Sequence, residues 1–92
     1  MIKEVINKDG SREPFDPSKI MKSIELSARE AGLDEGKVQA LVKEVGGAAI
    51  QFADTKEAIP TSTLKYKIMG DLDKREPAVS AAWRRFDAAK GK

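Results

Sequence analysis

The stretch from Val5 to Ile20 constrains the fold most, because it predicts a tight hairpin that leads directly into a helix. Asp9-Gly10 is a turn dipeptide, since both residues tolerate the positive φ angles of tight hairpin turns. Pro14 has no N–H to donate to a sheet, which predicts a short, edge-like return strand. Asp16 is placed to cap a helix that begins with proline, an arrangement in which no backbone hydrogen bond is lost.

Apolar residues recur at helical spacing over most of the remaining chain. Gly32 is predicted to end the first helix in a left-handed conformation, and Asp34 to cap the second. Ile59-Pro60 is predicted to be extended, at the end of a polar connector over residues 54–60, and Thr61 to be the N-cap of the third helix. The predicted elements are a hairpin over residues 2–15 and helices over about 17–31, 34–53, 61–75 and 77–89.

The glycine pair of the second helix and the apolar face of the last helix each lead to a prediction. Gly46-Gly47 interrupts the apolar stripe of the second helix, which favours close approach of another backbone or a slight kink over a functional hinge. Val79, Trp83 and Phe86 are predicted to form the apolar face of the last helix. Trp83 is therefore expected to pack in the core. Arg84-Arg85 could touch a ligand or a nucleic acid, but a solvated helix face is the default expectation.

The composition sets the class of protein. The chain has 92 residues, which predicts a single domain over residues 1–92. The predicted hairpin and four helices make its class α+β, mostly helical. It contains no Cys and no His, so disulfides, Cys/His zinc sites, Cys nucleophiles and His general bases are excluded. The net charge of +2 is too small to indicate a nucleic-acid footprint. No apolar run is long enough to span a membrane and no secretory segment follows Met1, so a cytoplasmic location is expected.

Lys8, Arg12 and Lys19 place cations beside the predicted turn and helix start. Ammonium and guanidinium groups together with exposed backbone N–H groups bind phosphate well, although a solvated charged hairpin is the commoner outcome of such a cluster. Glu13 and Asp16 are rejected as a catalytic pair, because a helix cap among cations has a lowered pKa. Either carboxylate could instead accept a hydrogen bond from an exocyclic amino group such as that of adenine.

A second polar group comprises Thr61, Ser62, Thr63 and Lys65. Hydroxyls at a helix N-terminus favour anion binding, whereas ordinary capping needs Thr61 alone. The chain has no Walker-type or Rossmann glycine motif and no Ser/His/Asp set, so hydrolytic and redox centres are not indicated and no catalytic or metal-binding residues are predicted.

Taken together, these segments resemble the ATP-cone domain. The match at the N-terminus rests on the ordered residues Val5, Lys8, Asp9-Gly10, Glu13, Phe15, Asp16 and Lys19-Ile20. A later match is Ile59-Pro60-Thr61-Ser62, and the resemblance extends from Ile2 to about Phe86. It implies a β-hairpin lid on a four-helix cluster. It also implies a non-catalytic regulatory module, as found in ribonucleotide reductases and in the zinc-ribbon repressor of their genes, with ATP or dATP as the effector, with or without Mg²⁺.

The resemblance also implies roles for individual residues. Lys8 and Lys19 would hold phosphates, Glu13 and Asp16 would approach the adenine, and backbone around Val5 and Asn7 would pack on the base. Thr61 and Lys65 would close the sugar or phosphate side. The implied nucleotide-binding set is Val5, Asn7, Lys8, Glu13, Asp16, Lys19, Ile20, Thr61 and Lys65. Asn7 departs from the pattern, since many members carry a second basic residue at this position.

Three functions follow from the sequence. The first is a regulatory ATP/dATP-binding module, either free-standing or a fragment of a longer protein, that acts on a partner protein such as a ribonucleotide reductase or transcription regulator, or by self-association. The second is a protein-interaction module of the same fold that has lost nucleotide binding, motivated by Asn7. The third, opposed by the balanced charge, is a small nucleic-acid binder that uses Lys3, Lys8, Arg12, Arg84 and Arg85.

Overall fold

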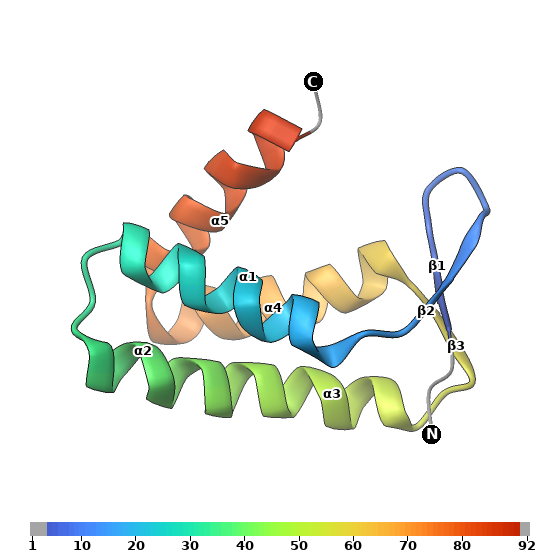
Figure 1. Cartoon of the computed structure of the whole chain (residues 1–92), viewed down its shortest axis with the longest axis horizontal. Helices are drawn as coiled ribbons and strands as arrows, with labels where there is room; N and C mark the ends of the chain where they lie inside the picture. Colours follow the sequence, from blue (N-terminus) through green and yellow to red (C-terminus); the bar gives the residue numbers. More distant parts are fainter. Residues whose placement is uncertain (1–3, 91–92) are drawn as a thin grey trace.

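A small sheet lies at one end of a cluster of helices in the computed structural model, which describes residues 4–90 (Figure 1). The elements are β1 (Glu4–Ile6), β2 (Arg12–Pro14), α1 (Pro17–Glu30), α2 (Glu35–Leu41), the π-helical segment η1 (Val42–Gly46), α3 (Gly47–Asp54), β3 (Ala58–Pro60), α4 (Thr61–Arg75) and α5 (Pro77–Lys90). Because α2, η1 and α3 form one continuous rod, the helices are four in number within the described part of the chain. The predicted α+β, mostly helical class with an N-terminal hairpin is confirmed.

The hairpin turn is fixed by hydrogen bonds within residues 7–11. The N–H of Asn7 donates to the carbonyl of Ser11 at 2.8 Å, and the N–H of Gly10 donates to the carbonyl of Asn7 at 2.9 Å. Gly10 has a φ of +88°, the left-handed conformation that a side chain disfavours. The Asp9 carboxylate accepts the N–H of Ser11 at 2.9 Å. Hydrogen bonding to the Ser11 side chain, followed by that to its backbone N–H, lowers the pKa of Asp9. The turn therefore holds Lys8 at the tip of the hairpin.

The sheet contains a strand that sequence reasoning missed. The strand order is β2-β1-β3, with β1 antiparallel to β2 and parallel to β3. The polar connector expected over residues 54–60 ends in this strand, where Ile59 is fully buried and pairs with Val5. Parallel pairing joins residues that are distant in sequence, so no local sequence pattern predicts the pairing of β3 with β1. Ile2 and Lys3, which were expected in the first strand, lie outside the described residues.

The helix termini show one correction. The Asp16 carboxylate caps α1 by accepting the N–H of Ser18, and Asp34 caps α2 by accepting the N–H of Lys37, as expected. The prediction of Thr61 as an N-cap was wrong, because Pro60 occupies the N-cap of α4 and Thr61 is already the first helical residue. Pro60 has the extended backbone of β3, with φ −60° and ψ 138°, so the strand passes into the helix one residue earlier than expected.

The rod made of α2, η1 and α3 packs along α1 where the glycine pair occurs (Figure 1). Gly46 is buried, and a Cβ atom at this position would lie 3.5 Å from Cγ of Met21 and 3.6 Å from Cδ1 of Ile24. Both distances are ordinary van der Waals separations and both neighbours are side chains, so the close approach of another backbone that the sequence favoured is not seen at this position. The π-helical turn at η1 ends at the same residue.

One apolar core joins the helices to the sheet. Its fully buried large side chains include Ile24, Val38, Val45, Ile59, Leu72 and Val79. Trp83 is partly buried and packs against this core, as expected. Phe86 does not, since 41% of it is exposed, and the expectation that it would lie on the buried face of the last helix was wrong.

Candidate functional site

Three adjoining hollows lie where the hairpin meets the first turns of α1 and α4. Their volumes are about 910, 200 and 160 Å³. Thr61 lines all three, which joins them into one surface groove, called the hairpin groove below. The largest hollow falls in the size range of small-molecule sites, roughly 300–1,000 Å³.

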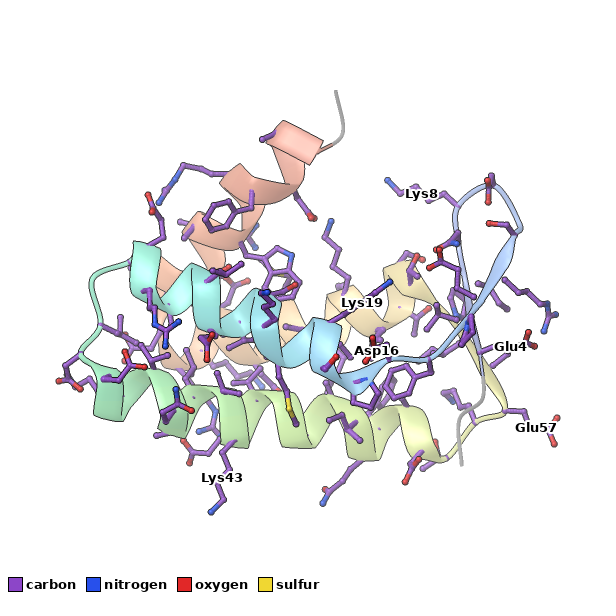
Figure 2. The ribbon with its side chains drawn as sticks, in the orientation of Figure 1. Glu4, Lys8, Asp16, Lys19, Lys43 and Glu57 are labelled. Atoms are coloured by element: carbon purple, nitrogen blue, oxygen red, sulfur yellow. The ribbon has the colours of Figure 1, made fainter. Side chains whose placement is uncertain are left out.

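Every residue that the sequence assigned to nucleotide binding lines this groove. The residues are Val5, Asn7, Lys8, Glu13, Asp16, Lys19, Ile20, Thr61 and Lys65. Lys8 and Thr61 share the largest hollow, and Lys19 and Thr61 share the other two. Figure 2 shows Lys8 extending from the hairpin back toward the helices, and Lys19 leaving the start of α1 on the same side of the molecule. The fold therefore brings the candidate residues together, while their role in nucleotide binding stays a prediction.

One end of the groove is apolar with carboxylates at its edge. Its apolar lining comes from Val5, Phe15, Ile20 and Leu64. Glu13 and Asp16 line the same hollow. A flat apolar ring fits such a lining, and a carboxylate can accept hydrogen bonds from an amino group on that ring. This end of the groove suits a purine base.

Asp16 is ionised and already engaged by its own helix. Its Oδ1 accepts the backbone N–H of Ser18 at 3.0 Å and the hydroxyl of Ser18 at 2.6 Å. The hydrogen bond from the Ser18 side chain, followed by that from its backbone, lowers the pKa of Asp16 below its ordinary value. Asp16 is therefore an acceptor at neutral pH and is not suited to act as a general acid.

The other end of the groove is cationic. Lys8 reaches it from the hairpin, Lys65 from α4 and Arg84 from α5. Thr61 and Ser62 of the first turn of α4 line the same hollow. A helix N-terminus presents backbone N–H groups that lack partners within the helix, and these favour anions. Cations and a helix N-terminus around one hollow are suited to phosphate groups.

Two of the predicted residues have other partners in this structure. The ammonium group of Lys65 forms an ion pair with the carboxylate of Asp87 on α5. The side-chain amide of Asn7 donates to the hydroxyl of Ser11 at 3.1 Å, so this side chain supports the turn. The position that carries a second cation in many ATP cones thus has a structural role here.

The nucleotide-binding set expected from the sequence lacks several groove residues that come from α4 and α5. They are Ser62, Tyr66, Met69, Trp83, Arg84 and Asp87. Ser62 was considered as part of an anion site or cap at the helix start, and Arg84 as part of a solvated face or of a nucleic-acid surface. The packing of α5 against α1 and α4 brings Trp83, Arg84 and Asp87 to the groove. No local signal in the sequence reports this packing.

Residues 4–90 contain no group of three or more acidic side chains that could hold a metal ion. None of the helices described for this chain combines the length and hydropathy that crossing a bilayer requires.

The comparison with known families agrees with the geometry of the groove. Residues 3–88 match the family model of the ATP cone domain. The chain belongs to the ATP-cone family. ATP-cone domains are regulatory nucleotide-binding modules, which agrees with a groove that has an apolar end and a cationic end.

The relatives among curated proteins are transcriptional repressors. NrdR 3 of Paramagnetospirillum magneticum is 28% identical over 90 residues, which covers 94% of this chain and 58% of that protein. NrdR of Treponema denticola is 31% identical over 68 residues, covering 74% of this chain and 45% of that protein. NrdR of Bdellovibrio bacteriovorus is 28% identical over 68 residues, covering 74% of this chain and 34% of that protein. The chain thus spans less than two thirds of the length of each of these relatives.

Proposed function

We propose that this ATP cone binds ATP or dATP in the hairpin groove and acts as a regulatory module without catalytic activity of its own. The observation that carries the proposal is the gathering of Lys8, Lys19, Lys65 and the N-terminus of α4 around one groove with an apolar end. A nucleoside triphosphate has the matching polarity, since one end is an apolar ring and the other is a polyanion.

The base occupies the apolar end in this proposal, with Glu13 and Asp16 accepting hydrogen bonds from the adenine amino group. Backbone around Val5 and Asn7 packs on the ring. Lys19 lines the two smaller hollows, and from there it contacts the phosphates.

Lys8 and Lys65 hold the phosphates at the cationic end, and Thr61 stands at the sugar where the hollows meet. Mg²⁺, where present, accompanies the phosphates. Ionised donors make stronger hydrogen bonds to phosphate oxygens than neutral ones do, which favours the triphosphate over shorter nucleotides.

The regulated partner is proposed to be a protein, either a ribonucleotide reductase or a transcription regulator, with a cytoplasmic location. The likeness to NrdR repressors supports the second class. A nucleotide can shift such a partner only through a difference in its affinity for two states of the assembly.

Isothermal titration calorimetry with ATP and dATP tests the binding step. Replacing Lys19 with alanine should weaken binding about fivefold or more, because a charge-assisted contact is removed. Lys43→Ala is the matched control, since Lys43 lies on η1 and points away from the hairpin side of the molecule (Figure 2). Absence of heat at millimolar nucleotide, or equal losses in both variants, would overturn the proposal.

A protein-interaction module without a ligand is the second candidate, and the position of Asn7 favours it. The Asn7 amide is bonded to Ser11 and supplies no positive charge to the groove. A partner that is retained equally with and without nucleotide, on a chain that gives no heat with ATP, would establish this second function.

A further inference from the structure

Arg84 lines the cationic end of the hairpin groove, although it comes from α5 and was not expected there. It shares the largest hollow with Lys8 and Lys65 and does not line the two smaller ones. Its side chain is 57% exposed, so a ligand has access to it. Among the cations of the groove, Arg84 and Lys8 therefore mark the end opposite the apolar pocket.

Arg84 gives the largest hollow its net positive charge. Lys8 and Lys65 are balanced by Glu13 and Asp87, which line the same hollow. Lys65 is moreover paired directly with Asp87. Arg84 is the group that makes the lining positive, and its partner Asp73 is not part of that lining. A polyphosphate needs this excess of positive charge.

The guanidinium of Arg84 is held in place by the junction of α4 and α5. Its Nη2 lies 3.1 Å from Oδ2 of Asp73, and its Nη1 donates to the hydroxyl of Ser80 at 3.4 Å. Ser80 is buried, and its hydroxyl donates to Oδ1 of Asp73 at 2.5 Å. These bonds also lower the pKa of Asp73, first through Ser80 and then through Arg84.

This restraint lowers the entropy lost when a ligand binds, because the arginine is already ordered. A guanidinium also carries more N–H donors than these two contacts use, so it can bind a phosphate and keep its anchor. Its planar donor arrangement matches phosphate oxygens in pairs.

We propose that Arg84 binds the terminal phosphates of the nucleoside triphosphate in the hairpin groove and thereby determines the preference for triphosphates over monophosphates. This assignment rests on the proposed function. It makes α5 a third wall of the nucleotide site. The hairpin forms one of the other walls, and the first turns of α1 and α4 form the second.

The test compares Arg84→Gln with Arg85→Gln, using ATP and AMP as calorimetric ligands. Arg85 is the matched control, because it is the next residue on the same exposed stretch of α5 and lines none of the three hollows. We expect R84Q to weaken ATP binding about tenfold, the loss of one exposed charge-assisted contact, with AMP binding changed less than about twofold. R85Q should leave both affinities unchanged, and R84K should recover part of the ATP affinity.

The outcomes separate this assignment from the proposed function. If the wild-type chain binds ATP and R84Q binds it as tightly as R85Q does, the assignment of Arg84 is wrong and the groove remains a nucleotide site. Equal losses for ATP and AMP in R84Q would also overturn it, since they indicate a structural defect. If the wild-type chain binds no ATP, the proposed function itself fails. Melting curves without nucleotide check that R84Q and R84K are folded.

Discussion

Replacing Asp87 with asparagine tests how α5 controls the groove. In the structure the Lys65 ammonium is paired with the Asp87 carboxylate, so a phosphate must compete with that carboxylate for the lysine. Asparagine keeps the size of the side chain and removes the negative charge. We therefore expect Asp87→Asn to bind ATP more tightly than the wild-type chain.

The magnitude follows from the exposure of the pair. The side chains of Lys65 and Asp87 are 45% and 34% exposed, so solvent screens much of their attraction. Ion pairs of this kind contribute about 0.2–1 kcal/mol. Releasing Lys65 should tighten ATP binding roughly 1.4- to fivefold, and the same substitution should lower the free energy of unfolding by up to about 1 kcal/mol. If Lys65 binds phosphate, Asp87→Asn should therefore show a higher affinity for ATP together with a lower free energy of unfolding.

The fluorescence of Trp83 provides the assay. Trp83 is the single tryptophan of the chain, and it lines the same hollow as Lys19 and Thr61. Asp71→Asn is the control, because it removes the carboxylate 3.3 Å from Lys67 on α4, and neither residue lines the groove. If D87N binds ATP no more tightly than D71N does, Lys65 is not a phosphate ligand.

Further predictions concern stability. Gly70→Ala should raise the free energy of unfolding by about 0.5–1 kcal/mol, because it is a helix-interior substitution and nothing lies within 4 Å of the added Cβ. Gly32→Ala should lower it by about 1–2 kcal/mol, because φ is +86° there; in urea denaturation, a loss for Gly70→Ala or a gain for Gly32→Ala would refute the corresponding prediction. Ile59→Ala should cost about 2–5 kcal/mol, since Ile59 is fully buried, and a smaller loss would mean that β3 is dispensable. The chain has no His, so stability should be nearly flat between about pH 5 and 8. Below that range it should fall, because hydrogen bonds from Ser18 lower the pKa of Asp16 in the folded state from its ordinary 3.8. A carboxyl with a depressed folded pKa stabilises above its unfolded pKa and loses that contribution as the pH falls through the folded value. Asp16→Asn should therefore show a shallower acid transition in circular dichroism, and an unchanged transition would contradict this.

The parts of the fold that could be predicted are those with a local cause. Gly10 and Gly32 both adopt the positive φ that their turn and helix end require. Asp16 and Asp34 each cap a helix through a backbone N–H a few residues ahead. Such features depend on neighbouring residues alone, so the sequence displays them directly.

The parts that could not be predicted depend on contacts between distant segments. β3 forms by pairing with β1, with Ile59 opposite Val5 and Pro60 opposite Ile6. Pro60 is therefore extended, and α4 begins at the next residue, Thr61. Phe86 follows the apolar spacing of α5 but lies beyond the part of that helix that the core covers. Periodicity identifies a face and does not say how far along the helix that face is buried.

The same division applies to the groove. Lys8, Lys19 and Thr61 were assigned through short ordered motifs, and the fold brings them to one surface. Arg84 and Asp87 reach that surface only because α5 packs back on α1 and α4. Their participation is a property of the tertiary fold and could not be derived from residue types in order.

The most direct test of the central claim is the set of amide chemical-shift changes that ATP causes in a ¹H–¹⁵N spectrum of the labelled chain. The account predicts that the changes gather at Asn7 and Lys8, Lys19 and Ile20, and Thr61 to Lys65, with little change around Lys43. Changes centred on η1 or scattered over all helices, or a spectrum unaltered at millimolar ATP, would contradict the claim that the hairpin groove is a nucleotide site.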